Sequence, residues 1–346
     1  MWKQFVAGAG AVAFAAVASA ADIAGAGASF PAPLYAKWAE RYKAETGILL
    51  NYQAIGSGGG IKQISANTVD FGASDKPLKP RELAKRGLYQ FPTVIGGIVP
   101  IVNLPGLRPG QLKLTGPLLA DVFLGKIRRW NAPQIAAVNP GLRLPNLPIT
   151  VVHRSDGSGT SFLFTSYLAL QSRDWQEQVG ANDAVQWPTG IGGKGNDGVS
   201  AFVKQTGGAI GYVEYAYAKQ NGSASVLLRN KAGRFVPPNA RTFAAAAESA
   251  NWRRSPGNHL VLVDQPGAIA WPIIGATFIL VHRDQRDAAR GASVLKFFDW
   301  AYTHGDAQAA ALDYVSVPTP VENLLKRQWA RVITAGGKPV YAPAAR

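Results

Sequence analysis

The chain has 346 residues, no cysteine and a formal net charge of +15. The lack of cysteine excludes disulfide bonds, thiolate metal sites and a lipid-modified N-terminal cysteine, and the length suffices for one or two domains without disulfides. A basic chain raises nucleic acid as a partner, but the basic residues are dispersed and their densest clusters, at 126–130 and 325–329, are short. We therefore expect a solvated basic surface and no nucleic-acid partner.

Residues 1–20 have the pattern of a secretory signal peptide. Lys3 gives a positive start, residues 5–17 are small and apolar, and an Ala-Ser-Ala cleavage motif follows at 18–20. The apolar run is too short to span a bilayer comfortably. We expect cleavage after Ala20 or Ala21 and export of the mature chain.

The first expected helix starts after a Gly-rich turn at 25–30. Its apolar residues recur with helical spacing: Leu34, Trp38 and Tyr42. Gly47 is expected to end this helix, since glycine readily adopts the left-handed cap conformation. This arrangement places Ser29 and Phe30 at a helix N-terminus.

A second junction of the same kind follows. A strand at 48–55 ends in Gly-Ser-Gly-Gly-Gly (56–60), and a short helix is expected at 61–66. The next strand, 69–74, is followed directly by Asp75. In open α/β sheets, ligands bind outside the carboxyl ends of the strands, so Ser57 and Asp75 are candidate ligand contacts.

A third junction spans 151–162, where a strand leads through Arg154-Ser-Asp-Gly-Ser-Gly-Thr to a helix. The first N–H groups of a helix have no internal partner and carry partial positive charge. The Arg154 guanidinium adds a planar fork of donors suited to an oxyanion. One such junction is common in proteins, but three of them together with an acid favour an anion-binding site.

Two β-rich runs, 91–102 and 271–281, are long enough to pass from one lobe to another. We therefore expect an α/β fold with two lobes, the first made from both ends of the chain. The expected divisions are 21–97 for the first part of lobe I, 98–269 for lobe II and 270–346 for the rest of lobe I.

The remaining expected elements are helices at 117–124, 132–138, 198–205, 243–250, 294–304 and 321–333 and strands at 147–152 and 209–217. Residues 190–195 match Gly-x-Gly-x-x-Gly literally, but no strand is expected before them, so the match does not indicate a nucleotide site. Asn196 and Asp197 are expected to cap the helix that follows.

The candidate site has donors but no catalytic base. His153 is the only histidine near it in sequence, and strand alternation would point it away from Arg154. No spacing typical of a metal site is present, so we expect no catalytic residue, no metal and no cofactor. An ionised Asp75 only accepts hydrogen bonds, so it pairs with an oxyanion that carries a proton, as phosphate does near neutral pH and sulfate does not. The alternative for Asp75 is an Asx-turn before Lys76-Pro77.

Five motifs resemble those of the periplasmic phosphate-binding proteins of Pst-type ABC importers. They are Gly-Ala-Gly-Ala-Ser-Phe-Pro-Ala-Pro (25–33), Gly-Ser-Gly-Gly-Gly-Ile-Lys-Gln-Ile (56–64), Asp-Phe-Gly-Ala-Ser-Asp (70–75), Arg-Ser-Asp-Gly-Ser-Gly-Thr-Ser-Phe (154–162) and Gly-Gly-Lys-Gly-Asn-Asp-Gly (192–198). The similarity runs from about Gly25 to Tyr341. Ser29 stands where the family commonly has Thr, and Gly58 where a second Ser is common.

The resemblance implies a two-lobed periplasmic-binding-protein (type II) fold, with a hinge near 91–103 and 268–280 and phosphate between the lobes. It implies eight phosphate contacts: Ser29, Phe30, Ser57, Asp75, Arg154, Ser158, Gly159 and Thr160. Asp156 would orient Arg154 without meeting the ligand. The implied partner is the inner-membrane permease, the implied location is the periplasm, and we expect a monomer.

Three alternatives remain at this point. The first keeps the fold but binds another protonated oxyanion or a phosphate ester. The second is an exported phosphatase, which the lack of a base disfavours. The third is an adhesive protein that uses the basic surface, which salt-sensitive binding to acidic polymers would support.

Overall fold

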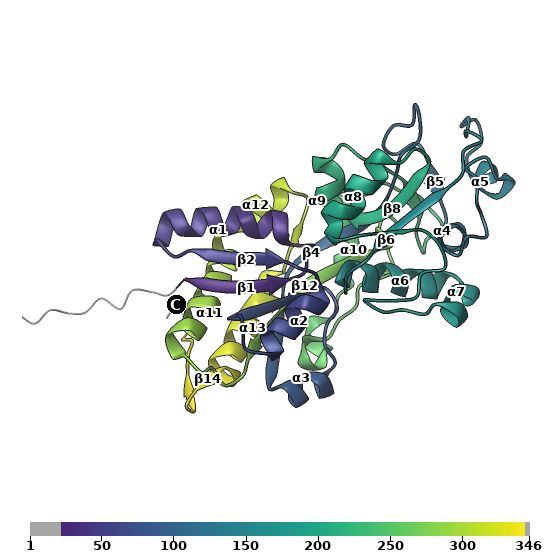
Figure 1. Ribbon diagram of the computed structural model, residues 1–346. Coiled ribbons are helices and arrows are strands. Elements are labelled where there is room, and N and C mark those ends of the chain that lie inside the picture. The colour runs from purple at the N-terminus through teal and green to yellow at the C-terminus, as the bar shows by residue number, and fades with distance from the viewer. Residues whose placement is uncertain (1–21, 343–346) are drawn as a thin grey trace, which may run out of the picture.

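In the computed structural model, residues 22–342 are described, and they form an elongated molecule with two parts (Figure 1). The expected signal peptide lies outside these residues. None of the helices between residues 22 and 342 is long and apolar enough to cross a membrane.

A ten-stranded sheet runs through both parts. Its main path is β2 (Leu50–Ala54), β1 (Ile23–Gly27), β3 (Phe71–Ser74), β12 (Ile274–His282), β4 (Leu88–Val102), β8 (Ala209–Glu214), β6 (Thr150–Arg154) and β7 (Ile191–Gly193). Two short strands, β9 (Ala224–Ser225) and β13 (Val315–Ser316), also pair with β4. Separate small sheets consist of β5 (Lys113–Leu114), β10 (Leu227–Arg229) and β11 (Phe235–Val236), and of β14 (Thr334–Ala335) and β15 (Lys338–Pro339).

The long strand β4 joins the two parts. Residues 88–97 of β4 pair with β12, and residues 98–102 pair with β8, antiparallel in both cases. We call β2, β1, β3, β12 and the first segment of β4 the first half-sheet. The second segment of β4 with β8, β6 and β7 is the second half-sheet. Within each half-sheet the outer strands are parallel, so their carboxyl ends share one edge.

The helices lie around these two half-sheets (Figure 1). The helices around the first are α1 (Ala32–Thr46), α2 (Ser57–Ser65), α3 (Pro80–Arg86), α11 (Ala288–His304), α12 (Asp306–Ala311) and α13 (Thr319–Val332). The remaining ones are α4 (Gly116–Phe123), α5 (Pro133–Val138), α6 (Gly159–Gln171), α7 (Arg173–Gln178), α8 (Gly195–Gln205), α9 (Tyr215–Gln220) and α10 (Ala240–Ala247), with 3-10 turns at η1 (Trp252–Arg254) and η2 (Pro256–Asn258).

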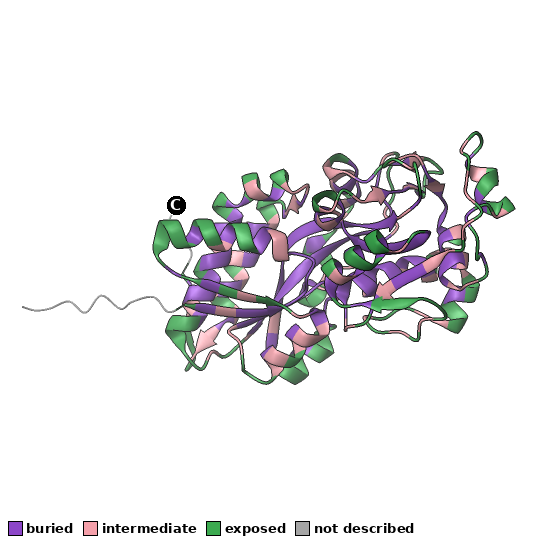
Figure 2. Ribbon diagram, turned by 45° about the horizontal axis from the view of Figure 1, so that its top comes forward, coloured by how far each residue is buried: buried purple, intermediate pink, exposed green. Residues whose placement is uncertain are grey.

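Helix α1 forms as its apolar spacing predicts. It buries Leu34, Trp38 and Tyr42, and Gly47 ends it in the left-handed conformation at φ 76°. The buried face of the helix meets the first half-sheet. Its inner strands β3, β12 and β4 are buried along most of their length, whereas the edge strand β2 is largely exposed (Figure 2).

Aromatic clusters attach the helices to each half-sheet. In the first, Phe91 of β4 lies between Phe298 of α11 and Trp329 of α13, with ring centroids 5.6 and 4.7 Å apart. In the second, Phe164 of α6 stacks on Tyr212 of β8 at 4.1 Å. Burying one such side chain stabilises the fold by roughly 1.5–3 kcal/mol. The C-terminal helices α11 and α13 therefore pack on the first half-sheet.

Several expected boundaries are wrong. Residues 25–27 belong to strand β1, because the small glycines let β1 lie between β2 and β3. Helix α2 begins at Ser57 and includes the glycine run. The expected strand 209–217 ends at Glu214, whose side chain accepts from Ala216 N and caps helix α9.

The region around 190–197 also differs from expectation. Residues 191–193 form strand β7, which pairs with β6, so a strand does lie within the glycine motif. Helix α8 already begins at Gly195. Asn196 therefore lies in its first turn and is not its N-cap.

Candidate functional site

The site lies where the carboxyl ends of strands from both half-sheets meet. Asp75 follows β3 and is 1% exposed. Thr277 Oγ1 of β12 donates to Asp75 Oδ1 at 2.7 Å. Burial raises the pKa of Asp75 to about 7, while the Thr277 hydrogen bond, the positive charge of Arg154 and Ser57 oppose this rise. Asp75 is therefore a buried carboxyl group that titrates near neutral pH.

Ser57, the first residue of α2, connects the two half-sheets. Its hydroxyl oxygen accepts hydrogen bonds from Asp75 N and from Gly159 N, each at 3.1 Å. Gly58 N also donates to Gly157 O across the same boundary at 2.9 Å. The N-terminus of α2 and the loop before α6 consequently lie against each other.

Gly159 allows this close approach. A Cβ atom at this position would lie 2.6 Å from Asp75 Cβ and 2.6 Å from Ser57 Oγ. Such distances are far shorter than a van der Waals contact, so only glycine fits without displacement. The N-termini of α2 and α6 thus face the same small region as Asp75.

Arg154 ends strand β6 and is 4% exposed. Asp156 accepts hydrogen bonds from Nε of Arg154 at 2.8 Å and from Nη2 of Arg154 at 2.5 Å. Burial by itself would raise the pKa of Asp156, but hydrogen bonds and charge from Arg154 hold it below its usual value. The third nitrogen, Nη1, is buried and has no hydrogen-bond partner among the described residues. A buried unpaired donor is costly, so Nη1 is a strong candidate for contact with an anion.

Ser158 and Thr160 lie at the start of α6 and are both buried. Ser158 is the N-cap, and its Oγ accepts from Ser161 N at 3.0 Å. Asn196 Nδ2 lies 3.4 Å from Thr160 Oγ1. The two hydroxyl groups therefore have partners that use them as acceptors, which leaves their own protons available to a ligand.

Ser29 and Phe30 enter the site from the turn between β1 and α1. Ser29 Oγ accepts from Asn196 N at 3.2 Å and from Asn196 Nδ2 at 2.9 Å. The backbone carbonyls of Ser29 and Phe30 accept from the hydroxyls of Tyr217 and Tyr314 at 2.7 and 2.6 Å. The turn is thus fixed on both sides.

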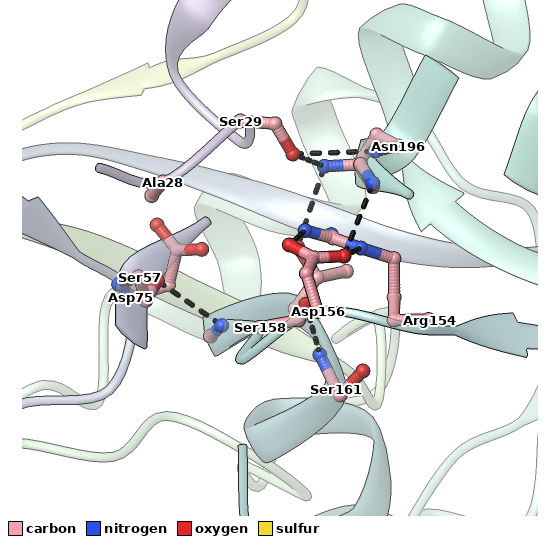
Figure 3. A network of polar contacts seen from close by, with 12 residues as sticks. Ala28, Ser29, Ser57, Asp75, Arg154, Asp156, Ser158, Ser161 and Asn196 are labelled. Atoms are coloured by element: carbon pink, nitrogen blue, oxygen red, sulfur yellow. Dashed lines mark hydrogen bonds and ion pairs between the residues drawn. The ribbon is translucent and has the colours of Figure 1, made fainter. Parts of the chain in front are cut away.

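Figure 3 shows the resulting network. Ser57 and Asp75 lie together on one side, while Arg154, Asp156 and Asn196 lie on the other, with Ser29 close to Asn196. The structure brings together all eight residues expected as ligand contacts: Ser29, Phe30, Ser57, Asp75, Arg154, Ser158, Gly159 and Thr160.

Reasoning from sequence missed two residues of this network. Asn196 connects Ser29 to the second half-sheet, where its Oδ1 accepts from Glu214 N at 3.0 Å. Thr277 holds Asp75 from a strand 202 residues later in the chain. Asn196 lies in the recognised motif 192–198, so a signal was present, but no local pattern distinguishes Thr277 from an ordinary strand residue.

The arrangement can bind an anion through Arg154, and its carboxyl group, Asp75, titrates near neutral pH. The His153 ring stacks on Trp187 with centroids 4.8 Å apart, and burial lowers its pKa. Glu214 is a further buried acid, and burial raises its pKa well above the usual value. No cluster of three or more His, Cys, Asp and Glu residues that could hold a metal occurs between residues 22 and 342.

Comparison with known proteins agrees with this fold. The family model described as the PBP superfamily domain matches residues 14–304. This is the class of protein that the two half-sheets define. Phosphate-binding protein PstS of Haemophilus influenzae is 54% identical over 312 residues, 90% of this chain and 93% of that protein. PstS of Pasteurella multocida is 52% identical over 329 residues, 95% and 96% of the two chains. The chain therefore belongs to the PstS family of phosphate-binding proteins.

Solved structures show the same fold. A periplasmic phosphate-binding protein, PfluDING, bound with phosphate, aligns with a TM-score of 0.73 at 22% identity, over 94% of this chain and 100% of that one. The phosphate-binding protein of Stenotrophomonas maltophilia aligns with a TM-score of 0.69 at 21% identity, over 92% and 97%. At these identities the likeness concerns the fold alone, and the expected two-lobed periplasmic-binding fold is confirmed.

Proposed function

We propose that this protein captures inorganic phosphate in the periplasm and delivers it to the permease of an ABC importer. One observation carries the proposal: a buried arginine with an unpaired Nη1 and a buried carboxyl group lie in the same site, on opposite half-sheets. An arginine alone would accept any oxyanion. The facing Asp75 restricts the ligand to one that carries a proton.

The proposed donors to phosphate are hydroxyl and backbone groups at three turns: Ser29, Phe30, Ser57, Ser158, Gly159 and Thr160. Arg154 contributes Nη1, and Asp75 accepts the proton of the ligand. Asp156 holds Arg154 through two nitrogens of the guanidinium group. Asp156 does not itself contact phosphate in this proposal. This assignment is supported by the N-termini of α2 and α6, which meet at Ser57, where Gly159 N donates to Ser57 Oγ.

The proposed lobes follow the two half-sheets. Lobe I consists of 21–97 and 270–346, and lobe II of 98–269. Within 98–269, the turns at 252–258 pack back on the first half-sheet, where Asn258 Nδ2 donates to Gln90 O. We place the hinge where β4 changes partner between Gly97 and Ile98 and where residue Ile273 meets Ile98 through a backbone hydrogen bond of 2.8 Å. Because the chain passes between the lobes in only a few segments, one lobe can rotate against the other.

Burial favours inorganic phosphate over a phosphate ester, the second candidate. Ser29, Ser57 and Thr160 are at most 2% exposed, so little room exists for a substituent on the anion. We further propose that the protein is a monomer and that it is not an enzyme. The names of its relatives, which are binding proteins, support the second proposal.

Titration with phosphate and with sulfate tests the proposal. The chain has nine tryptophans, so intrinsic fluorescence together with thermal shift can follow binding. At pH 8, above the pKa of about 7 of Asp75, phosphate is expected to bind and sulfate to bind far more weakly, because sulfate leaves the ionised Asp75 facing a second anion. Equal responses to the two anions would contradict the proposed selectivity, and no response to either would overturn the proposed function.

A further inference from the structure

A cavity of about 520 Å³ lies away from the site described above. It opens between α3, the start of β4, the turns η1 and η2, and α13, all packed on the first half-sheet. Arg283 lines it and follows directly after β12. The rise along a strand separates Arg283 from Thr277 by roughly 20 Å. The cavity therefore does not belong to the proposed phosphate site.

Four arginines from three separate segments line this cavity: Arg253, Arg254, Arg283 and Arg331. None of the lining residues is acidic. Within residues 22–342, none of the four guanidinium groups forms an ion pair or a side-chain hydrogen bond, whereas Arg154 and Arg290 do. Four unpaired positive charges around one cavity repel one another unless an anion binds there.

The wall that carries two of these arginines is rigid. Asn258 is buried, and its Nδ2 donates to Gln90 O at 2.7 Å. Gln90 Nε2 in turn donates to Gly257 O at 2.9 Å. The turn at 255–258 is thereby anchored to β4, so Arg253 and Arg254 project from a fixed support.

Part of the cavity wall is apolar and includes Leu83, Ala84 and Leu88. The volume falls in the usual range for small-ligand sites, roughly 300–1,000 Å³. Guanidinium forks match phosphate oxygens bidentately. Linked phosphate groups in one molecule present more oxygens than a single phosphate and can pair with several guanidinium groups at once.

We propose that this cavity, which we call the arginine pocket, is a second anion site that binds a small molecule with two or more linked phosphate groups. Inorganic oligophosphate and nucleoside diphosphate share this chemistry. The apolar wall offers a contact that only the nucleotide would use. The pocket also accounts for part of the high positive charge, which the phosphate site does not explain.

Calorimetric titration tests the arginine pocket, with inorganic phosphate first added to fill the interlobe site. Tripolyphosphate and ADP are expected to bind at one site per chain and adenosine not to bind. Tighter binding of ADP than of tripolyphosphate would identify the nucleotide as the preferred ligand, and the reverse order would identify inorganic oligophosphate; both results support the pocket.

Variants locate the binding. The double substitution Arg254→Gln/Arg331→Gln is expected to weaken oligophosphate binding at least about tenfold, because it removes two charge-assisted contacts. Arg327→Gln is the matched control, since Arg327 is exposed on the same helix but does not line the pocket, and it should change affinity less than about twofold. All three arginines are exposed, so the variants should fold.

Three results would overturn the proposal. In the first, tripolyphosphate and ADP both fail to bind. In the second, Arg327→Gln weakens binding as much as the double variant. In the third, an acidic peptide competes with the oligophosphates and binds the pocket more tightly than either. The interlobe variant Arg154→Ala should leave oligophosphate binding unchanged, so failure of the proposed phosphate site and failure of the arginine pocket are distinguishable.

Discussion

Asp156 holds Arg154 by two of its three guanidinium nitrogens, Nε at 2.8 Å and Nη2 at 2.5 Å, and leaves Nη1 free. Asp156 is itself fixed, because its Oδ1 accepts from Gly195 N at 3.1 Å. The pair therefore neutralises a buried charge and at the same time directs the remaining donor.

This geometry predicts that Asp156→Ala weakens phosphate binding by about tenfold, since the guanidinium loses its fixed orientation. Removing a negative charge near an anion would by itself strengthen binding, so the direction of the change distinguishes orientation from simple attraction. Arg154→Ala should cost more, about 100-fold, because it removes a charged hydrogen-bond donor. Phosphate titration followed by tryptophan fluorescence measures both effects.

Asp174→Ala provides the matched control. Asp174 pairs with Lys126 at the surface, with 54% of its side chain exposed. Exposed ion pairs contribute little, so this variant should bind phosphate as the unsubstituted protein does. Unchanged affinity in Asp156→Ala would show that Arg154 does not depend on its partner.

Asp75→Asn is expected to relax selectivity. The amide can donate a hydrogen bond, so sulfate no longer meets an unpaired carboxylate. Sulfate affinity should rise at least about tenfold while phosphate affinity falls, because each buried hydrogen bond to a charged group contributes roughly 1.5–3 kcal/mol. Competition between the two anions measures the ratio. A ratio equal to that of the unsubstituted protein would mean that another residue selects the ligand.

The raised pKa of Asp75 also predicts how stability without ligand depends on pH. In the folded state the carboxyl group titrates near pH 7, against an ordinary value of 3.8. Between these values the folded protein holds a proton that the unfolded chain releases, so stability falls as pH rises from about 4 to 7 and is lowest above 7. The full shift corresponds to at most about 4 kcal/mol.

Asp75→Asn should therefore be more stable than the unsubstituted protein at pH 8, and this difference should shrink toward pH 4. Thermal unfolding of both proteins without phosphate measures it. Burial raises the pKa of Glu214, and the negative charge of Asp75 adds to this rise. Asp75→Asn removes that repulsion, so at pH 8 Glu214 contributes to the difference in the same direction. A constant difference across this pH range would exclude titration of Asp75.

The sequence predicted most of the site because its residues lie in local motifs. Ser57, Asp75 and Arg154 each stand at the end of a strand, and strand ends meet at one edge of a sheet. Contacts that depend on tertiary packing could not be predicted. Thr277 reaches Asp75 only because β12 pairs with β3, and strand β1 forms from small residues that resemble a turn until both neighbouring strands are in place.

Gly159→Ala tests the close approach of the two half-sheets. The added Cβ would lie 2.6 Å from Asp75 Cβ, so the lobes could not come together as they do here. Phosphate affinity should fall at least about 100-fold, because the clash separates donors on one lobe from those on the other. Gly207→Ala is the control, since a Cβ there meets nothing within 4 Å. Similar affinities in the two variants would contradict the arrangement.

Asn196→Ala tests a residue that lies behind the ligand contacts. Its side chain accepts from Glu214 N in the second half-sheet and donates to Ser29 Oγ from the first. Its removal leaves one buried N–H without an acceptor and frees the Ser29 hydroxyl, so phosphate affinity should fall about tenfold. Asn139→Ala is the matched control, because Asn139 is buried and bonds to Lys113 and Ile135 far from the site. Both variants should lose stability, but only Asn196→Ala should lose affinity; if both bind phosphate equally well, Asn196 only stabilises the fold.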